Sequence, residues 1–291
     1  MCGIVGLFLK NSELHPHLGV HLSDMLSTMS DRGPDSAGIA LYSDASPDIL
    51  KFTVQSSHLQ DALDRMAGKT PFAFERKDTH AVVQCPQEDA DDLLTVLRSE
   101  PSIRIMSVGQ SIEIYKEVGL PDTVIDRFGL RDVSGSHGVG HTRMATESAV
   151  TTLGAHPFST GSDQCLVHNG SLSNHNNLRR ELIRQNVTIN TDNDTEVGAA
   201  YLTWKMQQGA TLGEALEASL NDLDGFYTFV VGTKNGFGVL RDPIACKPAV
   251  LAETDDYVAF GSEYRALVNL PGIAAATVWE PEPATVYFWE H

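Results

Sequence analysis

The order of hydrophobic and polar residues predicts strands and helices from the first residues onward. The apolar run Ile4 to Leu9 is short and continuous, which is typical of a buried strand. A helix that ends at Gly33-Pro34 is predicted next, because apolar residues recur at helical spacing at Leu18, Leu22, Met25, Leu26 and Met29. The segment 36–42 then predicts a second strand.

The same kinds of pattern return in the second half of the chain. Strands are predicted up to Thr142 and over 165–168, and helices over 173–185 and 195–207. Thr211 with Glu214 forms a capping box that opens another helix. Further strands are predicted over 226–232, 236–240, 249–251, 257–260 and 285–289. Since strands and helices do not alternate strictly, as a parallel doubly wound sheet requires, the predicted fold class is α+β.

Residues 44–136 have a different pattern and predict an inserted subdomain. Strands over 79–85, 102–107 and 111–116 and a helix over 89–98 suggest a βαββ-like unit whose last two strands form a hairpin around Gly109. Neither Cys85 nor His80 has a partner pattern typical of catalysis, so a structural or docking role is expected. The chain is thus predicted as one domain, 2–291, interrupted by 44–136.

Composition excludes several classes of function. The chain has 291 residues, 42 % of them hydrophobic, which is enough for a large core. A net charge of −17 opposes binding to nucleic acid or to an anionic membrane surface. The four cysteines, at positions 2, 85, 165 and 246, have neither metal-type nor disulfide-framework spacing, which favours a reducing cytoplasm. No apolar run is long enough to span a membrane.

The first candidate for chemistry is Cys2, in the sequence Met1-Cys2-Gly3. Removal of Met1 would leave a thiol nucleophile next to a free α-amine, whose ordinary pKa of about 7.7 to 8.0 suits a general base. Cysteine is also among the most buried residue types, so a small core residue at the start of a strand is the alternative.

Polar residues collect where predicted strands end or helices begin, in the segments 32–38, 141–146, 167–170 and 192–196. The amide of Asn169 and the backbone N–H of Gly170 suit an oxyanion hole. A tight hairpin turn is the alternative for an Asn-Gly pair.

Two charged residues suit an amino-acid head group. The planar guanidinium of Arg143 can bind a carboxylate with two hydrogen bonds, and the anion of Asp194 can bind an ammonium. A structural ion pair is the alternative for Arg143, and a helix cap is the alternative for Asp194. Three histidines lie on separate segments without ligand spacing, so no metal site and no imidazole base is predicted from His141, His156 and His168.

Taken together and in order, these motifs resemble class II glutamine amidotransferase domains, which are N-terminal nucleophile hydrolases. The matching stretches are Cys2-Gly3-Ile4-Val5-Gly6, the R-G-x-D-S-A-G segment at 32–38, His141-Thr142-Arg143, His168-Asn169-Gly170 and Asp194-Thr195-Glu196. The segments 241–248 and 261–267 are similar to the C-terminal half of that family. The resemblance implies a four-layer αββα sandwich of two antiparallel sheets.

The resemblance also implies a catalytic cycle. Cys2 would attack the side-chain amide of glutamine while its amine transfers the proton, and Asn169 and Gly170 would stabilise the oxyanion. A γ-glutamyl thioester forms, ammonia leaves, and water releases glutamate.

In the same family the substrate is bound by its head group. Carried over, Arg143 would bind the α-carboxylate and Asp194 the α-ammonium of glutamine, and His168 and Thr146 would add substrate contacts. This chain has Met144 where many members carry an aromatic residue after the arginine. The loop that covers glutamine is therefore expected to differ in detail.

The 141–148 stretch is most similar to the glutamate synthase-like group, which includes N-methylglutamate synthase. We therefore expect the ammonia-supplying glutaminase subunit of a multi-subunit amidotransferase, in a hetero-oligomer with synthase subunits. No cofactor site is expected in this chain, and FMN and an iron-sulfur cluster would belong to partner subunits. The alternatives are a stand-alone γ-glutamyl amidohydrolase and a non-catalytic regulatory or scaffold subunit.

Overall fold

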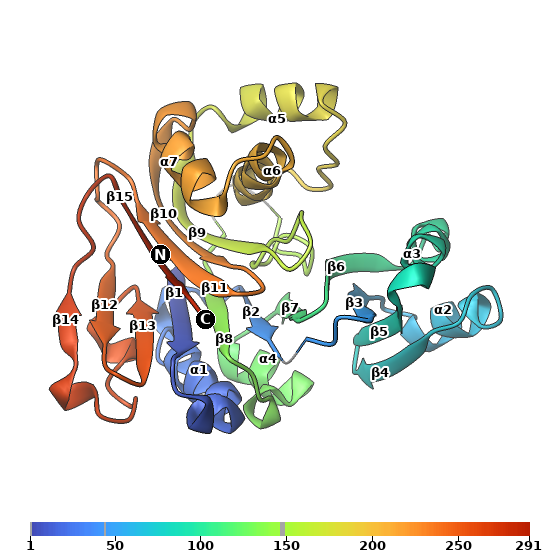
Figure 1. The fold of residues 1–291 in the computed structure, drawn as a ribbon, viewed down its shortest axis with the longest axis horizontal. Helices are drawn as coiled ribbons and strands as arrows, with labels where there is room; N and C mark the ends of the chain where they lie inside the picture. Colours follow the sequence, from blue (N-terminus) through green and yellow to red (C-terminus); the bar gives the residue numbers. More distant parts are fainter. Residues whose placement is uncertain (1, 44, 146–148) are drawn as a thin grey trace.

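The computed structural model describes residues 2–43, 45–145 and 149–291, which fold into three antiparallel sheets with flanking helices (Figure 1). The largest sheet has the order β14-β12-β13-β1-β8-β2-β7. Its strands are β1 (Gly3–Leu9), β2 (Ser36–Tyr42), β7 (Ile112–Val118), β8 (His137–Arg143), β12 (Val250–Glu253), β13 (Tyr257–Gly261) and β14 (Thr277–Trp279).

A second sheet has the order β15-β11-β10-β9, and a third has the order β4-β5-β3-β6. The second consists of β9 (Cys165–Leu172), β10 (Gly225–Gly232), β11 (Gly236–Arg241) and β15 (Thr285–Glu290). The third consists of β3 (Ile49–Gln55), β4 (Ala73–Lys77), β5 (His80–Pro86) and β6 (Arg104–Gly109).

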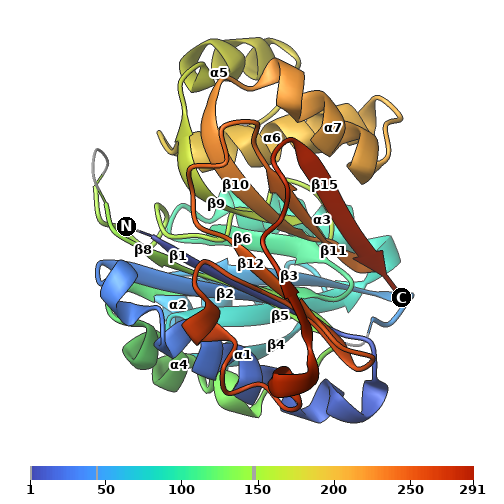
Figure 2. The ribbon, with the colours of Figure 1, turned by 90° about the vertical axis from the view of Figure 1, so that its left-hand side faces the viewer.

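The first two sheets stack face to face between two layers of helices (Figure 2). α1 (Leu18–Ser27) and α4 (Pro121–Phe128) cover the outer face of the seven-stranded sheet, and the other sheet is covered by α5 (His175–Arg184), α6 (Asp194–Gln207) and α7 (Leu212–Asp222). This order of layers confirms the predicted α+β class and the αββα sandwich. In the described ranges, every helix is too short or too polar to cross a lipid bilayer.

Strand β1 shows how the sequence builds these layers. Ile4 and Phe8 point into the core between the two sheets, whereas Val5, Leu7 and Leu9 pack under the α1 layer. Successive side chains of a strand point to opposite faces, so a continuous apolar run is what a strand buried on both faces requires. The prediction of a buried strand over 4–9 is confirmed.

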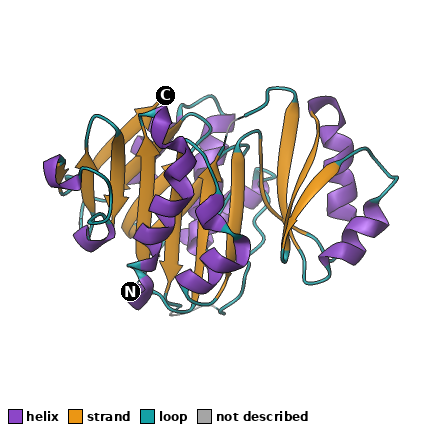
Figure 3. Cartoon of the chain, turned by 90° about the horizontal axis from the view of Figure 1, so that it is seen from below, coloured by secondary structure: helices purple, strands orange, loops and turns teal. Residues whose placement is uncertain are grey.

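The third sheet forms a separate layer with α2 (Leu59–Met66) and α3 (Ala90–Ser99), at the right of Figure 1 and of Figure 3. Its order of elements is βαββαβ, and the two helices pack on one face of the sheet around their own apolar core. The predicted βαββ unit was therefore incomplete, because β3, α2 and β4 were not recognised. The alternation of Leu50, Phe52 and Val54 is the pattern that could have indicated β3.

The predicted hairpin around Gly109 is wrong. β6 pairs with β3 in the third sheet, whereas β7 pairs with β2 at the edge of the seven-stranded sheet. β7 and α4 therefore belong to the sandwich, and the separate layer spans 49–109 rather than the whole of 44–136.

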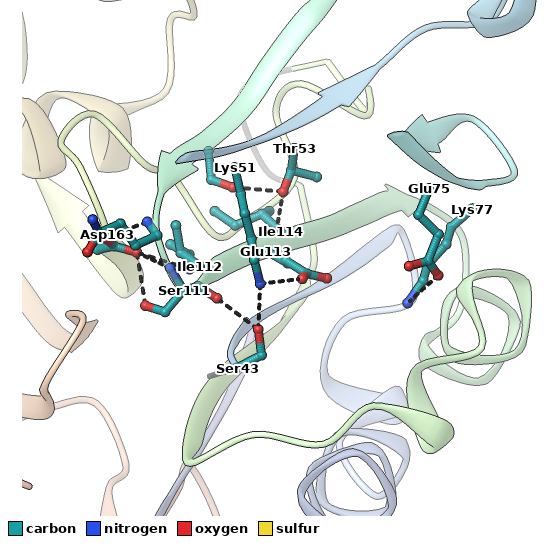
Figure 4. A network of polar contacts seen from close by, with 12 residues as sticks. Ser43, Lys51, Thr53, Glu75, Lys77, Ser111, Ile112, Glu113, Ile114 and Asp163 are labelled. Carbon is teal, nitrogen blue, oxygen red and sulfur yellow. Dashed lines mark hydrogen bonds and ion pairs between the residues drawn. The ribbon is translucent and has the colours of Figure 1, made fainter. Parts of the chain in front are cut away.

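The buried carboxylate of Asp163 binds the chain where it passes from β6 of the third sheet to β7 of the seven-stranded sheet (Figure 4). Asp163 Oδ1 accepts hydrogen bonds from the backbone N–H groups of Ser111 (2.8 Å) and Ile112 (3.0 Å), and Oδ2 accepts one from Gln110 N (2.8 Å). Successive backbone N–H groups make such an anion-binding concavity. Asp163 lies two residues before β9, so the exit of the third sheet is attached to the segment that leads into the second sheet.

Candidate active site

Cys2 lies directly before β1 and is half-buried. Its Sγ accepts a hydrogen bond from Met144 N (3.4 Å) and lies 3.7 Å from Met144 O. The thiol thus lies beside the segment that leaves the end of β8. The alternative interpretation of Cys2 as a core residue is wrong, because the side chain borders a cavity.

That cavity has a volume of about 760 Å³ and brings the predicted residues together. Its walls include six residues that the sequence predicted from four separate segments: Cys2, Arg143, His168, Asn169, Gly170 and Asp194. Thr146, the remaining candidate, lies outside the described residues. A concave site with a few convergent polar groups is the usual form of a small-molecule site.

Two side chains hold the main chain of Cys2. Its carbonyl accepts hydrogen bonds from Arg32 Nε (2.9 Å) and from Asn169 Nδ2 (3.1 Å). Asn169 Nδ2 also donates to Ser262 Oγ (3.2 Å), which accepts a hydrogen bond from Ile4 N (2.9 Å). Sequence analysis gave no role to Arg32 or Ser262, although both lie in segments that carry the family resemblance.

Arg32 is itself fixed by charge. It is buried, and its guanidinium forms an ion pair with Glu263, which also pairs with Arg265 at 2.7 Å. The hydrogen bond from Arg32, with the charges of both arginines, lowers the pKa of Glu263 below its ordinary value. Cys2 is therefore attached through Arg32 to the segment that follows β13.

The backbone N–H of Gly170 projects from the outer edge of the second sheet. Tyr227 of β10 is the residue opposite Gly170. Its carbonyl accepts a hydrogen bond from Asp242 N (3.1 Å), so the backbone N–H and C=O of Tyr227 point toward β11. The main chain of Gly170 therefore points away from β10, since residues of an antiparallel pair alternate in hydrogen bonding. His168 and Leu172 lie two residues before and two residues after Gly170. The carbonyl of His168 and the N–H of Leu172 form hydrogen bonds with side chains beyond the same edge.

Asn169 and Gly170 lie inside β9, so the alternative of a hairpin turn is wrong. Position 170 nevertheless requires glycine. Its φ is +144°, and a Cβ would lie 1.9 Å from the carbonyl oxygen of Phe226.

Asp194 is the first residue of α6, and the helix cap is its neighbour. Asn193 accepts the hydrogen bond from Thr195 N (2.8 Å), as an N-cap does. Asp194 Oδ2 instead accepts a hydrogen bond from Leu172 N (2.9 Å). The carboxylate thus joins α6 to the edge of β9, and the alternative of a simple cap is wrong.

His168 lies under the cavity, between β9 and α6. Its Nδ1 is 3.0 Å from Thr195 Oγ1 and 3.8 Å from Asp194 Oδ1. Burial lowers the pKa of His168, and the charge of Asp194 opposes this shift. Burial thus favours the neutral imidazole, whose contacts are with Thr195 and Asp194 at the start of α6.

His141 and His156 form a second buried pair, with ring centroids 4.0 Å apart. His141 Nε2 lies 3.1 Å from His168 O, and His156 lines the cavity. Burial lowers the pKa of His141 to about 3 and that of His156 well below its ordinary value. In the part of the chain that the structure describes, no three His, Cys, Asp or Glu side chains are arranged to hold a metal ion.

Charges of both signs line the cavity. Arg143 is buried, and its Nη1 donates to Ala149 O (3.2 Å). Lys247, which sequence analysis did not single out, lies at the wall with its Nζ 5.0 Å from the centre of the Phe226 ring. Asp192 and Asp194 supply the negative charges. This distribution suits a zwitterionic ligand such as an amino acid.

Comparison with known proteins identifies the class. Residues 141–269 match the family model described as a glutamine amidotransferase domain. Over its whole length, the chain is 65 % identical to the glutamine amidotransferase-like protein GlxB of Rhizobium meliloti (strain 1021), of which it covers 99 %. It is 31 % identical to a putative glutamine amidotransferase of Methanothermobacter thermautotrophicus, with 99 % of each chain covered. The chain therefore belongs to the class II glutamine amidotransferase family.

The fold has a solved counterpart in the glutamine phosphoribosylpyrophosphate amidotransferase from B. subtilis, crystallised with ADP and GMP. The TM-score is 0.65 at 21 % sequence identity, which shows similarity of fold alone. The match covers 99 % of this chain and 47 % of the solved chain, so the present chain spans about half the length of that enzyme.

Proposed function

We propose that this chain hydrolyses glutamine to glutamate and ammonia through a γ-glutamyl thioester on Cys2. The observation that carries the proposal is the convergence of Cys2, Arg143, Asn169, Gly170 and Asp194 on one cavity. Apart from Cys2, which directly precedes β1, these residues come from three different elements, β8, β9 and α6. A scaffold protein would have no need of this combination of nucleophile, paired charges and hydrogen-bond donors.

In the proposed cycle the thiol of Cys2 attacks the side-chain carbonyl carbon of glutamine. Loss of Met1 would free the α-amine of Cys2, which takes the thiol proton and delivers it to the leaving ammonia. The N–H of Gly170, a residue that lines the cavity, would bind the oxyanion. Asn169 Nδ2 would be the second donor. To bind the oxyanion it would break one of its two hydrogen bonds, either to the Cys2 carbonyl or to Ser262 Oγ. Water then attacks the thioester and releases glutamate.

The head group of glutamine would be bound by the paired charges. Arg143 would bind the α-carboxylate with its planar guanidinium, and Asp194 would bind the α-ammonium. His168, held between Thr195 and Asp194, and Thr146 would complete the contacts with the substrate. The two ends of the amino acid are thereby fixed while its amide reaches Cys2.

We further propose that ammonia is used by a partner chain, in a complex of the glutamate synthase-like type such as N-methylglutamate synthase. The similarity of the 141–148 stretch to that group supports this proposal. The acceptor reaction would then take place on other subunits, which would carry FMN and an iron-sulfur cluster. The layer built from 49–109 would then serve as a structural or docking unit.

Glutamine hydrolysis by the purified chain, with Met1 removal verified by intact mass, tests the proposal. We expect glutamate and ammonia in equal amounts from the wild-type chain, and none from Cys2→Ala. Cys246→Ala is the matched control, because Cys246 is exposed and lies in another segment. Equal activity of Cys2→Ala and the wild type would exclude the thioester mechanism. Full activity without any co-purifying protein would favour a stand-alone amidohydrolase.

A further inference from the structure

A buried lysine outside the proposed catalytic residues holds one wall of the cavity. Lys116 lies on β7, and its side chain is almost fully buried. Its Nζ donates hydrogen bonds to three backbone carbonyls of one loop: Ala155 O (2.7 Å), Pro157 O (3.0 Å) and Leu153 O (3.3 Å). An ammonium group has three donors and no acceptor, so this loop satisfies all of them.

This arrangement differs from a buried salt bridge. The acceptors of Lys116 Nζ are backbone carbonyls rather than carboxylates, and the ammonium lies 4.4 Å from the centre of the Phe158 ring. Removing a charge from water costs several kcal/mol unless fixed polar groups replace the water. Here the replacing groups are the loop carbonyls. The position of the loop and the charge of Lys116 therefore depend on each other.

The loop held by Lys116 carries a residue of the cavity. His156 lies between Ala155 and Pro157 and lines the cavity, and its ring packs against His141. His141 in turn bonds to the carbonyl of His168. A displacement of this loop would thus move the wall against which the head group of glutamine is proposed to bind.

The start of the same loop is tied to Arg143. Arg143 Nη1 donates to Ala149 O (3.2 Å), and Thr152 Oγ1 donates to Glu117, the neighbour of Lys116 on β7. None of these contacts reaches the thiol of Cys2 or the N–H of Gly170. Lys116 is thereby connected to substrate binding rather than to the groups proposed for bond breaking.

We propose that Lys116 is a positioning residue for glutamine: by binding three loop carbonyls, it sets the wall formed by His156 and the end of the Arg143 side chain. This inference rests on the proposed glutaminase function. Lys116→Met keeps the length of the side chain and removes the donors. We expect KM for glutamine to rise about tenfold or more while kcat stays within about twofold of wild type, because binding of the ground state and of the transition state is weakened equally.

Lys51→Met is the matched control. Lys51 is also largely buried, but its Nζ pairs with Glu113 (3.2 Å) and Ser43 (2.8 Å), away from the loop. This variant should keep the wild-type KM. Equal rises of KM in both variants, or an equal fall of kcat and kcat/KM in Lys116→Met, would overturn the positioning role.

Hydrogen exchange provides a second readout that needs no turnover. The amide of Ala155 donates to Thr151 O (3.1 Å), so its exchange rate reports the order of the loop. We expect about tenfold faster exchange in peptides covering 151–158 of Lys116→Met, with unchanged exchange in β1. Wild-type exchange in that variant would overturn the inference. A wild-type chain inactive on glutamine would instead overturn the proposed function, and the exchange result would still decide whether Lys116 holds the wall.

Discussion

Replacing His80 by phenylalanine should make the protein less sensitive to acid. His80 is fully buried where the third sheet meets the sandwich, and its ring packs edge-on against Phe128 with centroids 4.7 Å apart. Burial lowers the pKa of His80 to about 3, with the nearby charges of Lys116 and Arg127 acting in the same direction. Phenylalanine keeps an aromatic ring in this position and removes the titrating group.

The sign and size of the effect follow from linkage. Because the pKa is depressed in the folded state, the unfolded chain binds the proton first as the pH falls. The stability contributed by neutral His80 is therefore complete above about pH 6.5 and is lost toward about pH 3, with a slope of about 1.4 kcal/mol per pH unit. At about pH 5 the loss is about 2 kcal/mol.

Two more histidines add to the same loss in the wild-type protein. Burial also lowers the pKa of His137 and of His141 to about 3. Together with His80, they should reduce the free energy of unfolding by about 6 kcal/mol between about pH 8 and about pH 5. This is a large share of the stability of an ordinary domain.

Chemical denaturation at these two pH values measures the effect. We expect His80→Phe to lose about 2 kcal/mol less than the wild type on acidification, whatever its stability at about pH 8. His58→Gln, a change at an exposed histidine, is the control and should follow the wild type. An unchanged pH dependence in His80→Phe would refute the assignment of His80 as a buried neutral group.

Three further substitutions test separate parts of the structure. Gly170→Ala should reduce glutamine hydrolysis at least about a hundredfold, because its Cβ would lie 1.9 Å from Phe226 O and displace the N–H; near wild-type kcat would contradict this. Arg143→Lys should raise KM about tenfold or more in steady-state assays, since a lysine cannot bind a carboxylate with a planar fork; an unchanged KM would argue against carboxylate binding. Asp163→Asn should lower the free energy of unfolding by about 3 kcal/mol in denaturant titrations, because an amide NH₂ group would face backbone N–H groups; a change below about 0.5 kcal/mol would show that this junction contributes little.

Local signals in the sequence were sufficient for many elements of the sandwich. The capping box of Thr211 and Glu214 marks the start of α7, and both of its hydrogen bonds are formed. The continuous apolar run of β1 correctly indicates burial on both faces. In each case the signal lies within one element, so no distant residue is needed to interpret it.

Pairing between distant segments could not be predicted in the same way. β6 and β7 have the local signature of a hairpin, but Asp163, which lies before β9, binds the amides between them and each strand pairs in a different sheet. Asn169-Gly170 has the signature of a turn, yet both residues lie within β9, which pairs with β10 along its whole length.

The candidate active site shows the same difference between what local sequence signals indicate and what depends on distant segments. The resemblance to a family selected the residues that meet at the cavity, whereas no residue pattern indicated Lys116. Its role depends on three backbone carbonyls of one loop, and backbone groups are not visible in a residue pattern. The anchoring of Cys2 by Arg32 was missed for a related reason, since the acceptor is again a main-chain carbonyl.

Covalent labelling of Cys2 is the most direct test of the central claim. The purified chain, with loss of Met1 verified by intact mass, would be treated with a glutamine-mimicking diazoketone and mapped by peptide mass spectrometry. We expect one adduct, on Cys2, that excess glutamine suppresses and that Asp194→Asn forms at least about tenfold more slowly. An unmodified Cys2, or labelling of exposed Cys246 in its place, would contradict the claim that Cys2 is the nucleophile of a glutamine site.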